Sequence, residues 1–315
     1  MPTGVTTVVT KGKMITEQYF MGEVKTLLLP NARPILKRGP SLNTYKLLLL
    51  AAASSRPGLR RLSFALLRPF IHNGDIAIRY QCERRWYTAF IRMDDVYSDY
   101  YSVYEIAVRR VYHIDPNFAP DLVVDCGGNT GLFTLDAAAR YPSAKFVVCE
   151  PVPRNLDRIK RHFIVNSVAA DVLPVCVGGR RRVIPFYVRE ANQGSFDPTK
   201  PYTSKLNVEV LTLADVLRDR PAHRIYIKMD IEGMEIEALE SYVPGERRPV
   251  CIVGELHGHK ENSCHLERIF GDNGWQVMFE DVTDQGSIFE AYSPAALALL
   301  GRSVTIPEMS FGRER

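Results

Sequence analysis

The sequence predicts an α/β fold, a Rossmann-like and mostly parallel sheet of seven strands that ends in an antiparallel hairpin. Between residues 122 and 256, apolar runs typical of buried strands alternate with stretches of helical periodicity, as in β-α-β units. A glycine-rich turn follows the first of these strands, where open α/β sheets bind ligands. The chain then closes with two strand-like runs, 275–280 and 287–292, joined by a turn. A further parallel strand is therefore not expected there.

Apolar periodicity and breaker residues place the individual elements. Strands of the main sheet are expected at 122–125, 145–150, 171–177, 224–230, 250–256, 275–280 and 287–292. Helices are expected at 130–140, from Pro153 onward, at 213–218, at 234–242 and at 263–270. An inserted pair of strands, 183–188 and 206–211, brackets a polar loop. Before the main sheet we expect a hairpin of strands 76–80 and 86–92 and then a helix at 99–113.

These elements divide the chain into four parts. We expect a basic helical amino-terminal lobe at 1–74, with helices at 42–53 and 59–71. A β-hairpin and lead-in helix occupy 75–118, the cofactor-binding α/β domain 119–295, and a tail 296–315.

The charge of the chain is unevenly distributed. The net charge is +4, but residues 24–74 contain nine Lys or Arg and no acid, and residues 1–23 are neutral, which leaves 4 − 9 = −5 for the remainder. Because the basicity is local, no nucleic-acid partner is expected. The basic lobe has two interpretations: peripheral contact with an anionic membrane surface, or a helical lid with a solvated basic face.

The compartment is expected to be the cytoplasm. The longest apolar run, 47–53, is far shorter than the roughly 20 residues of a membrane span. The amino terminus shows no secretory signal pattern. Four of the six cysteines, at 126, 149, 176 and 251, fall inside or at the edge of runs expected to be buried strands, which favours free thiols.

The glycine-rich turn has the spacing G-x-N-x-G, formed by Gly127, Asn129 and Gly131. Its glycines allow tight turns and close approach of the backbone to a ligand, and the helix that follows favours a carboxylate at its start. Asp125 precedes the turn and would repel a pyrophosphate but suit an ammonium group. S-adenosylmethionine therefore fits better than a dinucleotide, although such glycines can also be purely structural.

Glu150 ends the second strand of the main sheet, 19 residues after Gly131. This is close to the spacing of an acid that accepts both hydroxyls of a ribose. We expect Glu150 to bind the ribose of the cofactor, and an ordinary strand-end glutamate is the alternative.

Charged residues gather at the end of the strand 224–230. Lys228, Asp230 and Glu232 reach the ligand edge of the sheet, where Lys228 can neutralise an acid and Asp230 can face the reacting groups. Favourable charge at a helix start is the alternative for Glu232, and it also accounts for Glu235. His257 lies beyond the next strand and is a candidate general base, in competition with an ordinary exposed histidine. His257 and His259 have no evident third ligand, so no metal site is expected.

Taken together, the motifs resemble the FkbM family of methyltransferases. The resemblance covers roughly residues 94–292 and rests on the segments 104–105, 123–131, 150–151, 192–195, 211–217, 227–235, 255–257 and 289–291. It implies an S-adenosylmethionine-dependent O-methyltransferase acting on a hydroxyl of a sugar-containing, glycolipid or polyketide-type metabolite, and it adds Glu105 to the cofactor-binding residues. The chain departs from the usual pattern at Cys126-Gly127-Gly128, and residues 1–74 match nothing in the family.

Two other functions are compatible with the same fold. A scaffold could bind a glycan or partner without turnover, but the presence of Asp125, Glu150 and Asp230 argues against it. A nicotinamide-dependent oxidoreductase disagrees with both the glycine spacing and the terminal hairpin. The pattern indicates neither the acceptor nor the oligomeric state.

Overall fold

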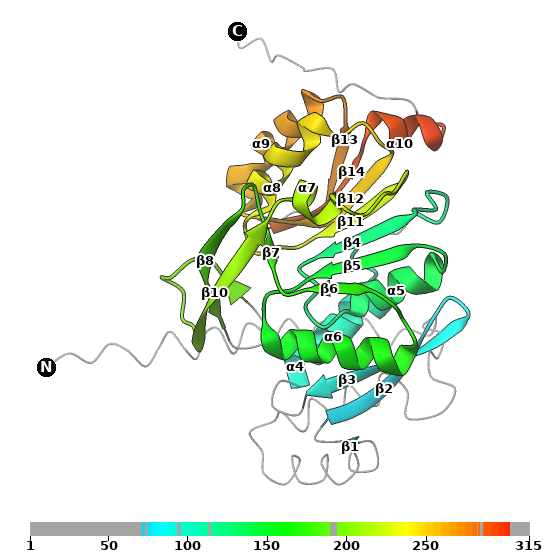
Figure 1. Ribbon diagram of the computed structural model, residues 1–315, viewed down its shortest axis with the longest axis vertical. Helices are drawn as coiled ribbons and strands as arrows, with labels where there is room; N and C mark the ends of the chain where they lie inside the picture. The colour runs from blue at the N-terminus through cyan, green and yellow to red at the C-terminus, as the bar shows by residue number, and fades with distance from the viewer. Residues whose placement is uncertain are drawn as a thin grey trace, which may run out of the picture. The chain divides into compact units, whose positions relative to one another are not determined.

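A seven-stranded sheet forms the centre of the computed structural model (Figure 1), which describes residues 71–72, 75–92, 96–112, 115–189, 194–281, 283 and 286–302. The strand order is β13-β14-β12-β11-β4-β5-β6. In chain order the strands are β4 (Leu122–Cys126), β5 (Lys145–Cys149), β6 (Asp171–Leu173), β11 (Ile225–Met229), β12 (Val250–His257), β13 (Gln276–Glu280) and β14 (Gly286–Tyr292). All neighbouring pairs are parallel except those of β14, which runs antiparallel to β12 and to β13. The predicted parallel sheet with a closing antiparallel hairpin is confirmed.

Helices cover both faces of this sheet (Figure 1). They are α5 (Leu132–Arg140), α6 (Pro153–Asn166), α7 (Leu213–Leu217), α8 (Glu235–Tyr242), the 3-10 turn η3 (Val243–Gly245), α9 (His259–Gly271) and α10 (Pro294–Leu299). Successive residues of a strand point to opposite faces. Accordingly Val124 and Ile227 belong to one buried apolar cluster, and Val123 and Tyr226 to another. Burial on both faces explains why these strands are continuous apolar runs.

Helix α10 crosses the expected boundary at residue 295. Ser293 accepts a hydrogen bond from the N–H of Ala296 and so caps the helix, and its hydroxyl also accepts from the N–H of Val250 at the start of β12. The α/β domain therefore continues to Leu299.

A second, four-stranded sheet stands beside the main one (Figure 1). Its order is β7-β10-β8-β9, with β7 (Cys176–Val177), β8 (Arg182–Val188), β9 (Gly194–Ser195) and β10 (Ser204–Leu211). The prediction of a single strand at 171–177 is wrong. Its first residues form β6 of the main sheet, and its last two form β7 of the second sheet. Pro174 lies at the break and has no N–H to donate, which interrupts strand pairing there.

The predicted hairpin before the main sheet is confirmed as β2 (Asp75–Cys82) and β3 (Arg85–Arg92), with β1 (Ile71–His72) pairing to β2. The helix predicted at 99–113 begins earlier, as α4 (Val96–Tyr104), and continues as the π-helical turn η2 (Glu105–Arg109). It ends at Arg110, which has a left-handed backbone with φ of 54°. The expected helix at 42–53, all but the last residue of the one at 59–71, and almost all of the basic lobe lie outside the described residues. Ile71 is described and belongs to β1, so the predicted helix does not include it.

Histidine 162 joins the hairpin to the main domain. Its fully buried ring accepts a hydrogen bond at Nε2 from the N–H of Phe90 (2.8 Å), and Nδ1 lies 2.7 Å from the carbonyl oxygen of Thr130. The neutral ring with a proton on Nδ1 satisfies both contacts. Burial lowers the pKa of His162 to about 4, because the charged ring would lose its solvation and its acceptor atom.

We expect stability to fall as the pH is lowered from 6.5 to 4. Below pH 6.5 the unfolded chain takes up a proton on His162 while the folded chain does not, which costs up to about 1.4 kcal/mol per pH unit. In His162→Gln, where the amide can accept from Phe90 and donate to Thr130 without titrating, this part of the pH dependence should disappear. Urea unfolding of both proteins at pH 4.5 and 7 measures it. If the free energy of unfolding depended on pH equally in the two proteins, His162 would not be the source of this pH dependence.

Two further observations bear on the sequence predictions. Each of the six cysteines is a free thiol, and Cys264 alone among them is exposed. In the part of the chain that the structure describes, none of the helices has the length and apolar character needed to cross a bilayer.

Candidate active site

A pocket opens at the carboxyl ends of β4, β5 and β11. Counting the open solvent at its mouth, the space between its atoms is about 550 Å³. Its polar wall contains Asn129, Glu150, Asn155, Asp230 and Glu232. Its apolar wall contains Val152, Val175, Val177, Phe186 and Phe196. The second sheet supplies Phe186, and Phe196 directly follows β9.

The glycine turn forms the floor of this pocket and lies against the backbone of β5 and β11. The N–H groups of Gly127 and Gly128 both donate to the carbonyl of Cys149 at 3.0 Å. Gly127 has φ of 80°, and a Cβ atom there would lie 1.8 Å from the carbonyl oxygen of Asp230. Both the backbone conformation and the contact therefore require glycine.

Replacing Gly127 should destabilise the domain. We expect Gly127→Ala to lower the free energy of unfolding by at least about 2 kcal/mol, because overpacking against backbone adds to the cost of a positive φ. Gly271→Ala is the control, since its Cβ would meet nothing within 4 Å. That control should change stability by less than about 0.5 kcal/mol. Urea unfolding measures both variants, and equal stability of the two would show that the contact at Gly127 is easily relieved.

Glu150 is held rigidly at the pocket wall. Its side chain is buried, Oε2 accepts from the N–H of Asn129 (2.8 Å), and Oε1 accepts from the N–H of Val152 (3.0 Å) and the amide of Asn155 (3.2 Å). Burial raises its pKa to about 7, although these donors favour the charged form. A carboxylate has about four acceptor positions, so one remains for a ligand.

Asn129 presents an unsatisfied atom beside Glu150. Its Oδ1 is buried and has no hydrogen-bond partner in the described part of the chain, and its backbone has φ of 47°. A buried acceptor without a partner is costly, and a donor on a bound ligand would relieve that cost.

Asp125, Lys228 and Gly131 support the turn and do not line the pocket. Asp125 is buried, accepts from the hydroxyl of Thr134 (2.8 Å), and lies 3.5 Å from the ammonium of Lys228. Lys228 donates to the carbonyl of Gly127 at 2.6 Å. Gly131 packs on α6, where a Cβ would lie 3.0 Å from the ring of Phe163. These three residues therefore act on the pocket through the turn.

Asp230 projects from the end of β11 toward the pocket. Its Oδ2 accepts from the hydroxyl of Tyr112 (3.0 Å) and lies 3.6 Å from the ammonium of Lys228. Burial alone would raise the pKa of Asp230, but Lys228 and the neighbouring His257 lower it below its usual value. The carboxylate is charged at neutral pH. The expected neutralisation of an acid by Lys228 is present in the structure.

His257 lies between carboxylates. Its Nδ1 is 3.0 Å from Oε1 of Glu235, and its Nε2 is 3.8 Å from Oε2 of Glu232. Burial would lower its pKa, but the hydrogen bond with Glu235 and the surrounding carboxylates raise it to about 10. At neutral pH the ring is therefore protonated, which does not favour the general base expected from the sequence.

Glu232 and Glu105 contribute less to the pocket lining than Glu150 and Asp230 do. Glu232 lies at its edge with a positive φ of 60°, and burial followed by repulsion from Asp230 raises its pKa to about 7. Glu105 begins η2 and is not among the pocket-lining residues. Burial and then the charges of Glu255 and Asp230 raise its pKa to about 7.

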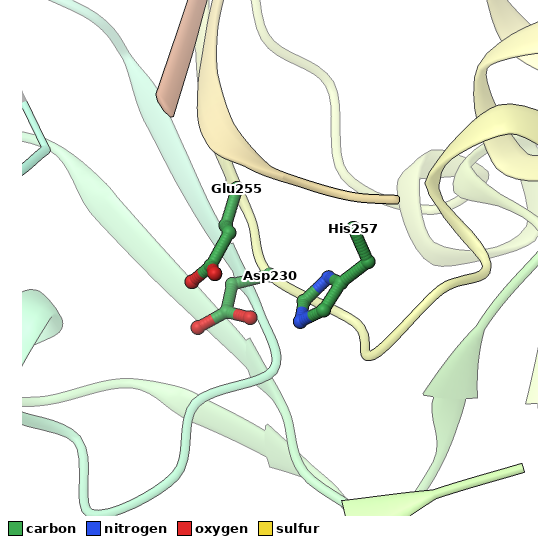
Figure 2. Close-up of side chains that lie close together, drawn as sticks. All are labelled: Asp230, Glu255 and His257. Atoms are coloured by element: carbon green, nitrogen blue, oxygen red, sulfur yellow. The ribbon is translucent and has the colours of Figure 1, made fainter. Parts of the chain in front are cut away.

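Several residues of the site were not among the sequence candidates. Glu235 was interpreted as favourable charge at a helix start, yet its buried carboxylate also accepts from the N–H groups of Ile231 and Gly233, each at 3.1 Å. Glu255 lies beside Asp230 and His257 (Figure 2). Its position two residues before His257, on the same face of β12, was the signal that could have identified it.

A parallel sheet with an inserted antiparallel last strand, and a ligand pocket at its glycine turn, defines a Rossmann-like methyltransferase. The chain belongs to the family of the methyltransferase FkbM domain, whose model matches residues 125–284. It is similar to Methyltransferase 1 of Beauveria bassiana, with 28% identity over 158 residues, 43% of this chain and 64% of the relative. It is also similar to Methyltransferase sdnD of Sordaria araneosa, with 29% identity over 170 residues, 43% of this chain and 66% of the relative. The matches thus span just under two thirds of these relatives.

Among solved structures, the chain is similar to methyltransferase FkbM from Methylobacillus flagellatus KT. It has 15% sequence identity and a TM-score of 0.39, and the match covers 74% of this chain and 59% of that one. A second is the 16S rRNA N2 G1207 methyltransferase of T. thermophilus in complex with AdoMet and guanosine. It has 12% identity and a TM-score of 0.40, and the match covers 70% of this chain and 51% of that one.

Proposed function

We propose that this methyltransferase transfers the methyl group of S-adenosylmethionine to a hydroxyl of a sugar-containing, glycolipid or polyketide-type metabolite. The observation that carries the proposal is the pairing of a rigid Glu150 carboxylate with the unsatisfied Asn129 Oδ1 in one pocket. Both groups accept hydrogen bonds, and the cofactor carries hydroxyl and amino donors. When bound, S-adenosylmethionine supplies an electrophilic methyl group.

The pocket residues fit the parts of this cofactor. Glu150 would accept a hydrogen bond from a ribose hydroxyl, because its three existing donors fix its carboxylate and leave one acceptor position. Val152, Val177 and Phe186 offer an apolar surface suited to the adenine ring. The turn at Gly127 lets the backbone approach the remainder of the cofactor.

The acceptor would bind on the Asp230 side. An ionised Asp230 can accept a hydrogen bond from the reacting hydroxyl and take its proton as the oxygen attacks, in one in-line displacement. Tyr112 and Lys228 hold the Asp230 carboxylate in place. His257 is the other candidate for the proton acceptor, and it must first lose the proton that Glu235 stabilises.

Transfer of a labelled methyl group tests the proposal. The purified full chain is incubated with S-adenosylmethionine carrying an isotopic methyl label and with separate panels of glycosides, glycolipids, polyketide alcohols and amines. We expect label on a hydroxyl oxygen of one alcohol class, located by mass spectrometry and NMR. Label on a nitrogen or carbon acceptor would contradict O-methylation, and S-adenosylmethionine binding without label on any alcohol would contradict the acceptor class.

A further inference from the structure

Three side chains with metal-binding atoms meet on the acceptor side of the pocket. One ligand atom each from Asp230, Glu255 and His257 lies within 4.8 Å of the other two. Figure 2 shows the two carboxylates beside each other and the His257 ring turned toward Asp230. Three atoms evenly spaced about 2.0–2.2 Å from one small divalent ion lie about 3.5–3.8 Å apart. Side-chain shifts of less than about 1 Å would therefore bring all three atoms to one ion.

The register of two central strands produces this arrangement. β11 and β12 are parallel neighbours in which Met229 pairs with Gly254, so the next residues, Asp230 and Glu255, lie at the same level. His257 follows Glu255 by two residues and lies on the same face of β12. The pairing of β11 with β12, together with the residues that directly follow the paired ones, thus brings the three side chains close together.

Glu235 orients the imidazole in a way that suits a metal ligand. It is almost fully buried, its Oε1 lies 3.0 Å from Nδ1 of His257, and the N–H groups of Ile231 and Gly233 fix the same oxygen. A carboxylate on one ring nitrogen directs the other nitrogen toward an ion, as is usual for metal-bound histidines. Nε2 of His257 then faces the ion, which must displace the proton that this nitrogen carries at neutral pH in the absence of the ion.

Glu255 supplies a half-buried carboxylate with no partner of its own. Among the described residues no hydrogen bond or ion pair is present at its side chain, whereas the carboxylates of Glu150 and Glu235 are each held by several donors. Two cations of the described part of the chain lie in this region: Lys228, which is shared by Asp125 and Asp230, and the protonated His257. The carboxylates of Asp125, Asp230, Glu235 and Glu255 outnumber them, so a divalent ion beside Glu255 would offset excess negative charge.

We infer that Asp230, Glu255 and His257 bind one divalent metal ion. Two carboxylates and one imidazole combine the oxygen donors preferred by Mg²⁺ and Mn²⁺ with a nitrogen donor, a set that suits Mn²⁺. Three protein ligands leave coordination positions open for oxygen atoms of the acceptor. In that position the ion would orient the acceptor hydroxyl, and this role of the ion rests on the proposed function. Binding of the ion itself does not depend on that function.

Titration of the chelator-treated full chain with Mn²⁺, followed by the EPR signal of free Mn²⁺, tests the site without any turnover. We expect one saturable site, with affinity at least tenfold weaker in Glu255→Gln, which loses the charge but keeps the shape. Glu240→Gln is the matched control, because Glu240 pairs with His265 at the surface (2.7 Å) away from the pocket. The Mn²⁺ affinity of Glu240→Gln should equal that of the unaltered protein. No saturable binding, or equal affinity in Glu255→Gln, would overturn the inference.

The role of the ion is tested separately from its binding. Methyl transfer should fall at least tenfold after removal of divalent ions and recover on addition of Mn²⁺. Undiminished methyl transfer in excess chelator would overturn the positioning role and leave the proposed function standing. Saturable Mn²⁺ binding with no methyl transfer to any alcohol would support the site and contradict the proposed function.

Discussion

Asp230→Asn should lower the turnover of methyl transfer by about 10²- to 10⁴-fold, which is the usual contribution of a positioned proton acceptor. The amide keeps the shape of the side chain and can still contact Tyr112, but it cannot take up the proton of the attacking hydroxyl. Lys228 would keep its contacts with Gly127 and Asp125. Affinity for S-adenosylmethionine should therefore change by less than about threefold. Single-turnover kinetics and calorimetry measure the two quantities.

Asp219→Asn serves as the control for this prediction. Asp219 is exposed beyond α7 and is not among the pocket-lining residues, so the same chemical change there should leave turnover unaltered. Near-normal turnover in Asp230→Asn would remove Asp230 as the proton acceptor and direct attention to His257. Parallel losses of turnover and cofactor affinity would instead assign Asp230 to cofactor binding.

Glu150→Gln should weaken S-adenosylmethionine binding by about 10²-fold, since hydrogen bonds to a charged acceptor are worth about 1.5–3 kcal/mol each. The amide retains one acceptor oxygen for the N–H of Asn129 or Val152 but loses the negative charge and the second oxygen. Circular dichroism establishes that the variant is folded, and calorimetric titration gives its affinity.

Glu209→Gln is the matched control for Glu150→Gln. Glu209 pairs with Arg181 at the surface (2.8 Å) and lies outside the pocket lining, so its loss should leave affinity unchanged. If Glu150→Gln bound the cofactor as tightly as the unaltered protein, the ribose assignment would be wrong.

Local patterns in the sequence predicted most of the main sheet. Strands such as 122–126 and 225–229 are apolar because both faces are buried, and Pro153 begins α6 because its missing N–H has no partner at a first helical turn. The division of 171–177 between two sheets could not be predicted in this way. That division depends on pairing of β7 with β10, a contact between distant parts of the chain.

The positions of the candidate site residues relative to the pocket depend on both local and distant contacts. Gly127, Asn129 and Glu150 do line the pocket, because motif spacing determines their position at the strand ends. Asp125 and Lys228 are buried beneath the turn, and that burial depends on Thr134 and on neighbouring strands. The protonated state of His257 depends on surrounding carboxylates, which no single motif reveals.

Calorimetric titration of the purified full chain with S-adenosylmethionine, and separately with NADH, tests the central claim most directly. We expect saturable binding of S-adenosylmethionine at one site, weakened about 10²-fold by Glu150→Gln, and no saturable binding of NADH. Saturable binding of NADH alone would contradict the account.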